Sequence, residues 1–179
     1  MAGVWTNNWK GLINSAILGG FYREGTTTAY DYQGKAAYMT NGNISSPVPS
    51  RITNDGSPGS GSLSIRFGQS DTTPDVSQYS LGDDATNNLT YINSSVISYN
   101  WDANTHTLTR SYRVTIQNKN AATITIREYG VYVGAYLTSN NGGTRVMLYR
   151  EVLDEPVTLG QYESGTINIS LSITIGDPV

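Results

Sequence analysis

The sequence contains no cysteine and a single histidine, His106. Without cysteine, neither a disulfide scaffold nor a four-cysteine zinc site is possible. One imidazole cannot supply the two or three histidines of a common zinc site, and a Ser-His-Asp triad would depend on His106 alone. His106 follows the turn-like run Asp102-Ala-Asn-Thr105, which is typical of the solvated tip of a hairpin. We therefore expect no metal, no other cofactor and no enzymatic activity.

Charged side chains are also scarce, at 14% of 179 residues against about 25% in an average soluble domain. The formal net charge is -3, with 11 Lys and Arg against 14 Asp and Glu. Because no excess of positive charge could displace counterions from phosphates, we expect no nucleic acid partner. Apolar runs such as Ala16 to Leu18 are far shorter than the roughly 18 residues that span a bilayer, so we expect no membrane partner. The first residues lack the basic and apolar regions of a secretory signal, which favours synthesis in a cytoplasm.

Polarity is carried instead by 19 Ser, 21 Thr and 16 Asn, and breakers are dense between Met39 and Ser62. We expect this stretch to separate an N-terminal segment, residues 1–61, from a main domain, residues 62–179. Within the first segment, Trp9, Leu12, Ile13, Ala16 and Ile17 lie on one face of a predicted short helix. That helix could cover one end of a sheet or act as an arm that docks on a neighbouring subunit.

The main domain shows strand periodicity. Apolar and polar residues alternate in several segments: 63–67, 89–99, 108–116, 122–136, 146–152 and 166–175. Apolar parity changes within 122–136, so we predict a β-bulge with an extra residue near Arg127 to Gly130. Asn140 to Gly143 favour a tight hairpin turn. The pattern predicts an all-β protein, an antiparallel β-sandwich of immunoglobulin-like or jelly-roll type with one short N-terminal helix.

Acidic residues offer few candidates for chemistry. Asp71 and Asp75, or Asp83 and Asp84, lack the spacing of a calcium loop, so we expect no metal there. Glu128 and Arg150 both lie at inward-facing strand positions of the predicted hairpin. We interpret them as a partly buried ion pair that fixes strand register, and the alternative is a catalytic acid held by an arginine.

Aromatic residues are dominated by types with a polar group: 13 Tyr and 3 Trp against 2 Phe. Such side chains suit subunit interfaces and sugar-binding platforms, because one end is apolar and the other can contact water. The alternative is an ordinary distribution between core and surface. The candidate interface residues are Trp5, Trp9, Tyr132, Tyr136 and Tyr149.

Three stretches together resemble a recurrent pattern in virion proteins of tailed bacteriophages. They are Ile65-Arg-Phe-Gly68-Gln-Ser-Asp-Thr-Thr-Pro74 with Tyr79-Ser-Leu81, Ile124-Thr-Ile-Arg-Glu128-Tyr-Gly130-Val-Tyr132, and Leu148-Tyr-Arg150-Glu-Val-Leu-Asp154-Glu-Pro156-Val-Thr158. Two departures are Gln69-Ser70, where the pattern has a second glycine, and Val131, where it more often has leucine. The resemblance covers roughly residues 62 to 175. It implies a β-sandwich subunit of the particle, on the capsid surface or in the tail apparatus, without enzymatic activity.

The leading hypothesis is a virion structural protein, a capsid-surface decoration or auxiliary subunit that forms a homo-oligomer and contacts other virion proteins. A tail, collar or fibre-attachment component is the close alternative. Two rivals belong to other classes. A carbohydrate-binding module would use exposed residues such as Trp101, and a small hydrolase would use Glu128, Asp83 or Asp84.

Overall fold

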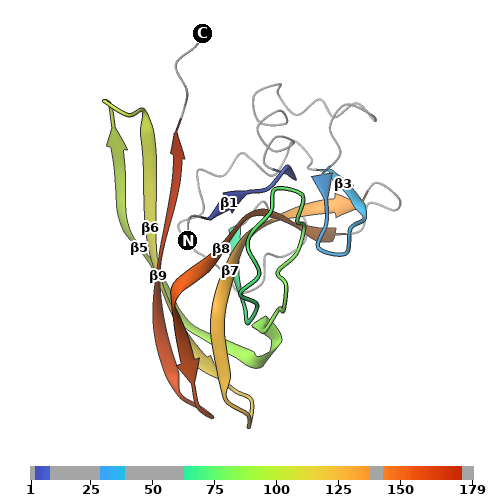
Figure 1. The fold of residues 1–179 in the computed structure, drawn as a ribbon, viewed down its shortest axis with the longest axis vertical. Coiled ribbons are helices and arrows are strands. Elements are labelled where there is room, and N and C mark those ends of the chain that lie inside the picture. The colour runs from blue at the N-terminus through green and yellow to red at the C-terminus, as the bar shows by residue number, and fades with distance from the viewer. Residues whose placement is uncertain (1–2, 9–28, 39–62, 138–142, 175–179) are drawn as a thin grey trace.

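The structure, a computed structural model, describes residues 3–8, 29–38, 63–137 and 143–174 of the chain. These residues form two antiparallel β-sheets (Figure 1), which confirms the predicted all-β class. The predicted helix from Trp9 to Ile17 and the predicted 39–62 loop both lie outside the described residues.

The first sheet has the strand order β1-β8-β7-β3-β2, and β4 also pairs with β7. Its strands are β1 (Val4–Trp5), β2 (Ala29–Tyr30), β3 (Ala36–Tyr38), β4 (Leu63–Gly68), β7 (Ile124–Leu137) and β8 (Gly143–Leu159). The second sheet has the order β5-β6-β9. It contains β5 (Leu89–Asp102), β6 (Thr107–Asn118) and β9 (Ser164–Thr174), and a short 3-10 helix, η2 (Thr86–Asn88), leads into β5.

Alternation explains which faces of the second sheet are buried. In β9, Ile167 and Ile169 are buried while Asn168 and Ser170 are exposed. Ile167 lies opposite Val114 of β6, and Ile169 lies opposite Tyr112, so both strands turn the same face inward. The strand predicted over residues 166–175 is therefore observed with nearly the same bounds.

The hydrophobic core takes residues from both sheets. Its buried members are Ile65, Phe67, Ala85, Leu89, Tyr112, Val114, Ile116, Ile124, Ile126, Tyr129, Val131, Tyr149, Leu159, Ile167 and Ile169. Residues of β4, β7 and β8 thus pack against residues of β5, β6 and β9. The core lies where the lower half of the three-stranded sheet runs beside β7 and β8 (Figure 1).

The register of the β7–β8 hairpin is interrupted where the sequence predicts it. Ile126 pairs with Val157 and Glu128 pairs with Val152, so Arg127 alone lies opposite Leu153 to Pro156. The irregularity is at the predicted place, but the extra residues belong to β8 rather than to β7. The predicted segment 146–152 is therefore only part of a longer strand, and Asp154, Glu155 and Pro156 belong to this bulge within β8. Proline is accommodated because a bulged residue makes no regular ladder hydrogen bond.

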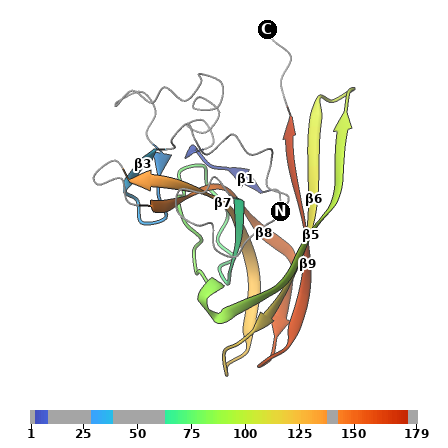
Figure 2. The same ribbon diagram turned by 180° about the vertical axis from the view of Figure 1, so that it is seen from behind.

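The hairpin end of β5 and β6, together with the end of β9, extends beyond the first sheet. Figures 1 and 2 show this projecting end from opposite sides. Asp102 and Thr107 close the hairpin, and His106 lies exposed at its tip with a φ of 49°. The predicted solvated position of His106 is confirmed. The backbone N–H of Asn104 donates to Asp102 at 2.8 Å, and this bond lowers the pKa of the Asp102 carboxyl.

Candidate functional site

Glu128 and Arg150 form an ion pair in the interior of the first sheet. Glu128 lies on β7 and Arg150 on β8, where Arg150 is opposite Gly130. The two side chains are therefore diagonal neighbours on one face of the hairpin. Arg150 Nε donates to Glu128 Oε2 at 2.6 Å, and both side chains are 0% exposed. Such a pair resists separation, because removing either partner leaves a buried charge without compensation.

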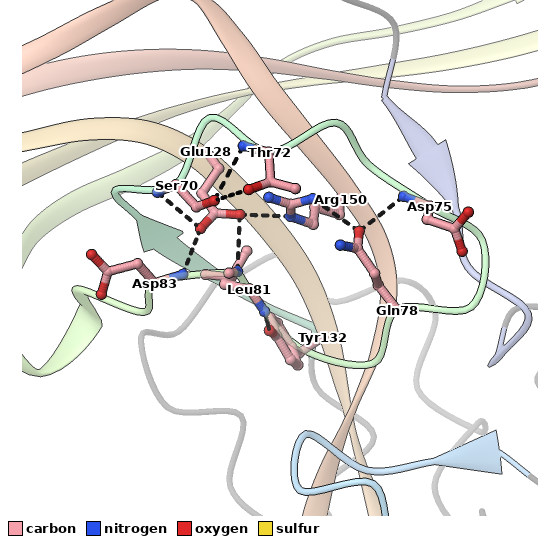
Figure 3. Close-up of polar contacts among 10 residues, drawn as sticks. Ser70, Thr72, Asp75, Gln78, Leu81, Asp83, Glu128, Tyr132 and Arg150 are labelled. Carbon is pink, nitrogen blue, oxygen red and sulfur yellow. Dashed lines mark hydrogen bonds and ion pairs between the residues drawn. The ribbon is translucent and has the colours of Figure 1, made fainter.

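The carboxylate of Glu128 also fixes the backbone of the loop that joins β4 to η2, residues 69–85, which we name the β4–η2 loop. Its Oε1 accepts hydrogen bonds from the backbone N–H of Ser70 at 3.3 Å and of Asp83 at 3.0 Å. Its Oε2 accepts from the N–H of Gly82 at 3.3 Å. The start and the end of the loop thus share one buried acceptor (Figure 3).

Arg150 fixes the middle of the same loop. Its Nη1 donates to Gln78 Oε1 at 2.8 Å, and that oxygen also accepts from the N–H of Asp75 at 2.9 Å. Tyr132 on β7 adds a further contact, because its hydroxyl oxygen accepts from the N–H of Leu81 at 3.1 Å. Figure 3 shows these residues beneath the loop. The hairpin therefore determines the conformation of an otherwise irregular segment.

Two glycines leave room for this arrangement. A side chain at Gly68 would overlap the Glu128 carboxylate and the backbone carbonyl of Asp83. A side chain at Gly82 would overlap the hydroxyl of Ser70. Close approach of the backbone to the carboxylate accounts for glycine at position 68, and close approach to the Ser70 side chain accounts for glycine at position 82.

This arrangement organises structure and is unsuited to acid catalysis. The Glu128 carboxylate is fully buried and is bound by three backbone amides and Arg150, so substrate cannot approach it. Asp84, another candidate acid, lies 2.7 Å from Arg66 Nη2 in a partly buried ion pair. Within the described ranges, no group of three or more His, Asp or Glu side chains could hold a metal ion.

The predicted interface residues whose side chains the structure describes, Trp5, Tyr132 and Tyr149, do not share one surface. Trp5 on β1 is half-buried, with its ring 4.9 Å from the Tyr149 ring and its Nε1 donating to Ser172 O. Tyr132 and Tyr149 are buried inside the chain, at 1% and 6% exposure, so their side chains belong to the interior rather than to an interface. Trp9 and the Tyr136 side chain lie outside the described residues.

The physical reason is that both faces of the first sheet are covered. Tyr132 packs with Leu81 and Met147 under the β4–η2 loop, and Tyr149 belongs to the core that the first sheet shares with the second. The same cover explains why Ser64 and Arg66 of β4 are buried, although alternation predicted a half-buried strand.

Most of the exposed apolar side chains lie on β5 rather than at the predicted interface residues. The sequence analysis did not identify most of them. Five of them lie on β5: Ile92, Val96, Ile97, Tyr99 and Trp101. Tyr99 is 69% exposed and Trp101 is 46% exposed. The available signal was a run from Leu89 to Trp101 that contains no charged residue. Of these five residues, the sequence analysis named only Trp101, as an exposed ring on which a sugar could stack.

Two buried tyrosines share a carboxylate at the edge of the core. The hydroxyls of Tyr129 and Tyr149 each donate to Glu151 Oε2 at 2.6 Å. Burial first, and then the hydrogen bond to Glu151, raises the pKa of both hydroxyls above the ordinary value of 10.0. The protonated tyrosines therefore stabilise the fold.

We expect this stabilisation to disappear at alkaline pH. The folded state holds these protons more tightly than the unfolded state, so stability is unaffected below pH 10 and falls above it. Tyr129→Phe removes one such proton, so the free energy of unfolding of this variant should fall less steeply with pH, by about 1.4 kcal/mol per pH unit. Urea unfolding of both proteins between pH 9 and pH 11.5 measures the slopes. Identical slopes would contradict the assignment.

No helix within the described ranges is both long and apolar enough to cross a membrane. Comparison of the chain with protein-family models, with curated proteins and with solved structures finds no match.

Proposed function

We propose that this chain is a non-enzymatic structural subunit of a bacteriophage virion, with its two sheets packed as a β-sandwich. The proposed position is the capsid surface, as a decoration or auxiliary subunit, and the alternative position is the tail, the collar or a fibre-attachment site. Assignment to a virion rests on the resemblance of the three sequence stretches. Assignment to assembly rather than catalysis rests on the structure.

The observation that carries the assembly role is the exposed edge strand β5, which is uncharged from Leu89 to Trp101. Among the described strands, β5 pairs only with β6, so its other edge is available for pairing. Soluble proteins usually protect such edges with charged residues, proline or an inward-pointing charge. No charged residue or proline occurs between Leu89 and Trp101, and the register shifts at Ile92 and Ile97 protect only the first part of the strand. From Ser98 to Trp101 the edge is regular and uncharged, which is typical of a strand that pairs with another chain.

A second copy of the chain fits this edge. Two β5 strands, uncharged from Leu89 to Trp101, can pair antiparallel about a two-fold axis, which keeps the two Asp102 residues at opposite ends of the contact. Register shifts at Ile92 and Ile97 interrupt the first part of β5, and regular pairing resumes from Ser98 to Asp102. The contact should therefore centre on the projecting end. On a symmetric particle, many weak contacts of this kind become stable, because linked sites bind at a high effective concentration.

A carbohydrate-binding module is the second candidate, favoured by the exposed rings of Tyr99 and Trp101 on one strand. Tyr99 lies opposite Arg110 and Trp101 lies opposite Leu108, and beyond these two residues lie Leu171 and Ile173 of β9. Sugar sites combine stacking rings with several polar groups that bind hydroxyls. The aliphatic neighbours therefore favour a protein contact over a sugar contact.

Mass spectrometry of washed virions tests the proposed function. We expect this chain at many copies per particle, because a capsid-surface subunit occupies repeated positions. An internal scaffold protein that leaves the particle serves as the control for contamination by host lysate. Washed particles that lack the chain would contradict the proposal.

A further inference from the structure

The projecting end of the three-stranded sheet has two faces of different chemistry. Directly opposed residues of antiparallel strands point to the same face. Tyr112 and Ile169 point into the core, and every second residue beyond them continues that face. We name this continuation the Arg110 face. Its residues are Tyr99, Trp101, Leu108, Arg110, Leu171 and Ile173.

The opposite face is covered by hydroxyl groups that pair with one another. The pairs between β6 and β9 are Thr107 with Thr174, Thr109 with Ser172, Ser111 with Ser170, and Thr115 with Thr166, at 2.9–3.0 Å. This surface is satisfied by its own hydrogen bonds and by water. The Arg110 face, by contrast, exposes the rings of Tyr99 and Trp101 to solvent, and its aliphatic residues Leu108, Leu171 and Ile173 are half-buried.

Arg110 is the charged residue of that face. It lies between Tyr99 of β5 and Leu171 of β9, and its guanidinium is 5.4 Å from the centre of the Tyr112 ring. Among the described residues, no carboxylate forms an ion pair with Arg110, and its buried Nε has no hydrogen-bond acceptor. Burial of Nε without an acceptor is unfavourable, and a partner carboxylate that binds the other guanidinium nitrogens, which are not among the buried atoms without a partner, would offset part of this cost.

We infer that the Arg110 face binds a segment of another protein in which one Asp or Glu carboxylate is flanked by apolar residues. The carboxylate accepts from the guanidinium, whose planar donors suit a bidentate contact. The flanking apolar residues cover Leu108, Leu171 and Trp101. This inference deepens the proposed function, on which it rests, by naming the chemistry of the partner.

Charge decides between this partner and two others. A second copy placed face to face would bring two Arg110 guanidinium groups together, and like charges in an apolar contact are unfavourable. An acidic glycan would supply a carboxylate but would leave Leu108, Leu171 and Ile173 against sugar hydroxyls. An acidic, apolar protein segment satisfies both the guanidinium and the aliphatic surface.

A random twelve-residue peptide library, displayed on phage and selected against the immobilised full chain, tests the inference. Enriched peptides are synthesised in two forms, with the acid and with its amide, and their dissociation constants are measured by fluorescence polarisation. We expect enriched peptides to share one Asp or Glu beside apolar residues. Replacing that acid by its amide should weaken binding at least about tenfold, which corresponds to loss of one charge-assisted hydrogen bond.

Variants of the chain locate the contact. Arg110→Gln should weaken binding of the acid peptide to the same extent, and should not weaken the amide peptide further. Arg113→Gln is the matched control, because Arg113 is an exposed arginine of β6 on the hydroxyl face; it should change binding less than about twofold. If Arg110→Gln does not fold, the pair of acid and amide peptides still tests the contact on the unaltered chain.

Two outcomes would overturn the inference. In one, the enriched peptides contain no carboxylate; in the other, the acid peptide binds Arg110→Gln and the unaltered chain equally well. Binding of sialylated or uronic-acid glycans without any peptide would assign the face to carbohydrate, and loss of self-association in Arg110→Gln would assign it to a second copy. Failure here is distinguishable from failure of the proposed function. Virions that contain the chain, combined with no peptide enrichment, would refute only this inference.

Discussion

Replacing Glu128 with alanine is expected to lower the free energy of unfolding by about 3–5 kcal/mol. The substitution leaves the Arg150 guanidinium buried without its carboxylate. It also leaves the N–H groups of Ser70, Gly82 and Asp83 without the acceptor that holds the β4–η2 loop. Equilibrium denaturation in urea, with the unaltered chain as reference, measures the loss.

Two further variants separate the ion pair from its effect on the loop. Arg150→Ala should cost a comparable amount, whereas Arg113→Ala, at an exposed position of β6, should change stability by less than about 0.5 kcal/mol. The double variant Glu128→Met with Arg150→Met removes both charges but restores no acceptor for the loop. It should remain less stable than the unaltered chain, with faster amide exchange at Ser70 and Asp83. Equal stabilities of Arg150→Ala and Arg113→Ala would show that the ion pair contributes nothing.

Adding positive charge to the β5 edge is expected to abolish self-association. Ile97 and Asn100 are both exposed on this strand, and Asn100 lies opposite Thr109 on the hydroxyl face rather than on the Arg110 face. In a pair of β5 strands, Ile97→Lys with Asn100→Lys would place like charges from two copies against each other. Because such juxtaposition costs several kcal/mol, the dissociation constant of the oligomer should rise at least about hundredfold.

Analytical ultracentrifugation measures this change as a shift toward the 19.4 kDa monomer. Gln161→Lys, at an exposed turn between β8 and β9, adds charge away from the edge and is expected to leave the oligomer intact. An unaltered chain that remains monomeric at high concentration would contradict pairing through β5. So would a double-lysine variant with the same mass distribution as the unaltered chain.

Sequence periodicity was sufficient to predict the strands of the second sheet and the class of the fold. Alternation in β6 and β9 reports burial directly, since each of these strands has one face in the core and one in solvent. It was less informative for β4, where Ser64 and Arg66 are buried despite their polarity. The β4–η2 loop that covers them cannot be placed by local pattern, because its contacts with β7 and β8 are made over long sequence separations.

The candidate site could likewise be predicted only in part from the sequence. Glu128 and Arg150 were identified as a pair because both occupy inward-facing strand positions. Their connection to Ser70, Gln78 and Asp83 was not predictable, since no local signal indicates which backbone amides will meet a buried carboxylate. Tyr132 and Tyr149 were assigned to an interface because alternate strand residues were expected to face outward.

The amino-acid sequence alone determined the all-β class, the alternating faces of β6 and β9, the hairpin tip at His106 and the inward position of Glu128 and Arg150. These features follow from local periodicity and turn chemistry, which act between residues close in the chain. Tertiary structure alone decided that the β4–η2 loop covers Tyr132, that the bulge residues lie in β8, and that β5 is an exposed edge beside the Arg110 face. Those features depend on which distant segments pack together, and packing of distant segments is set by the whole core rather than by any one stretch of sequence.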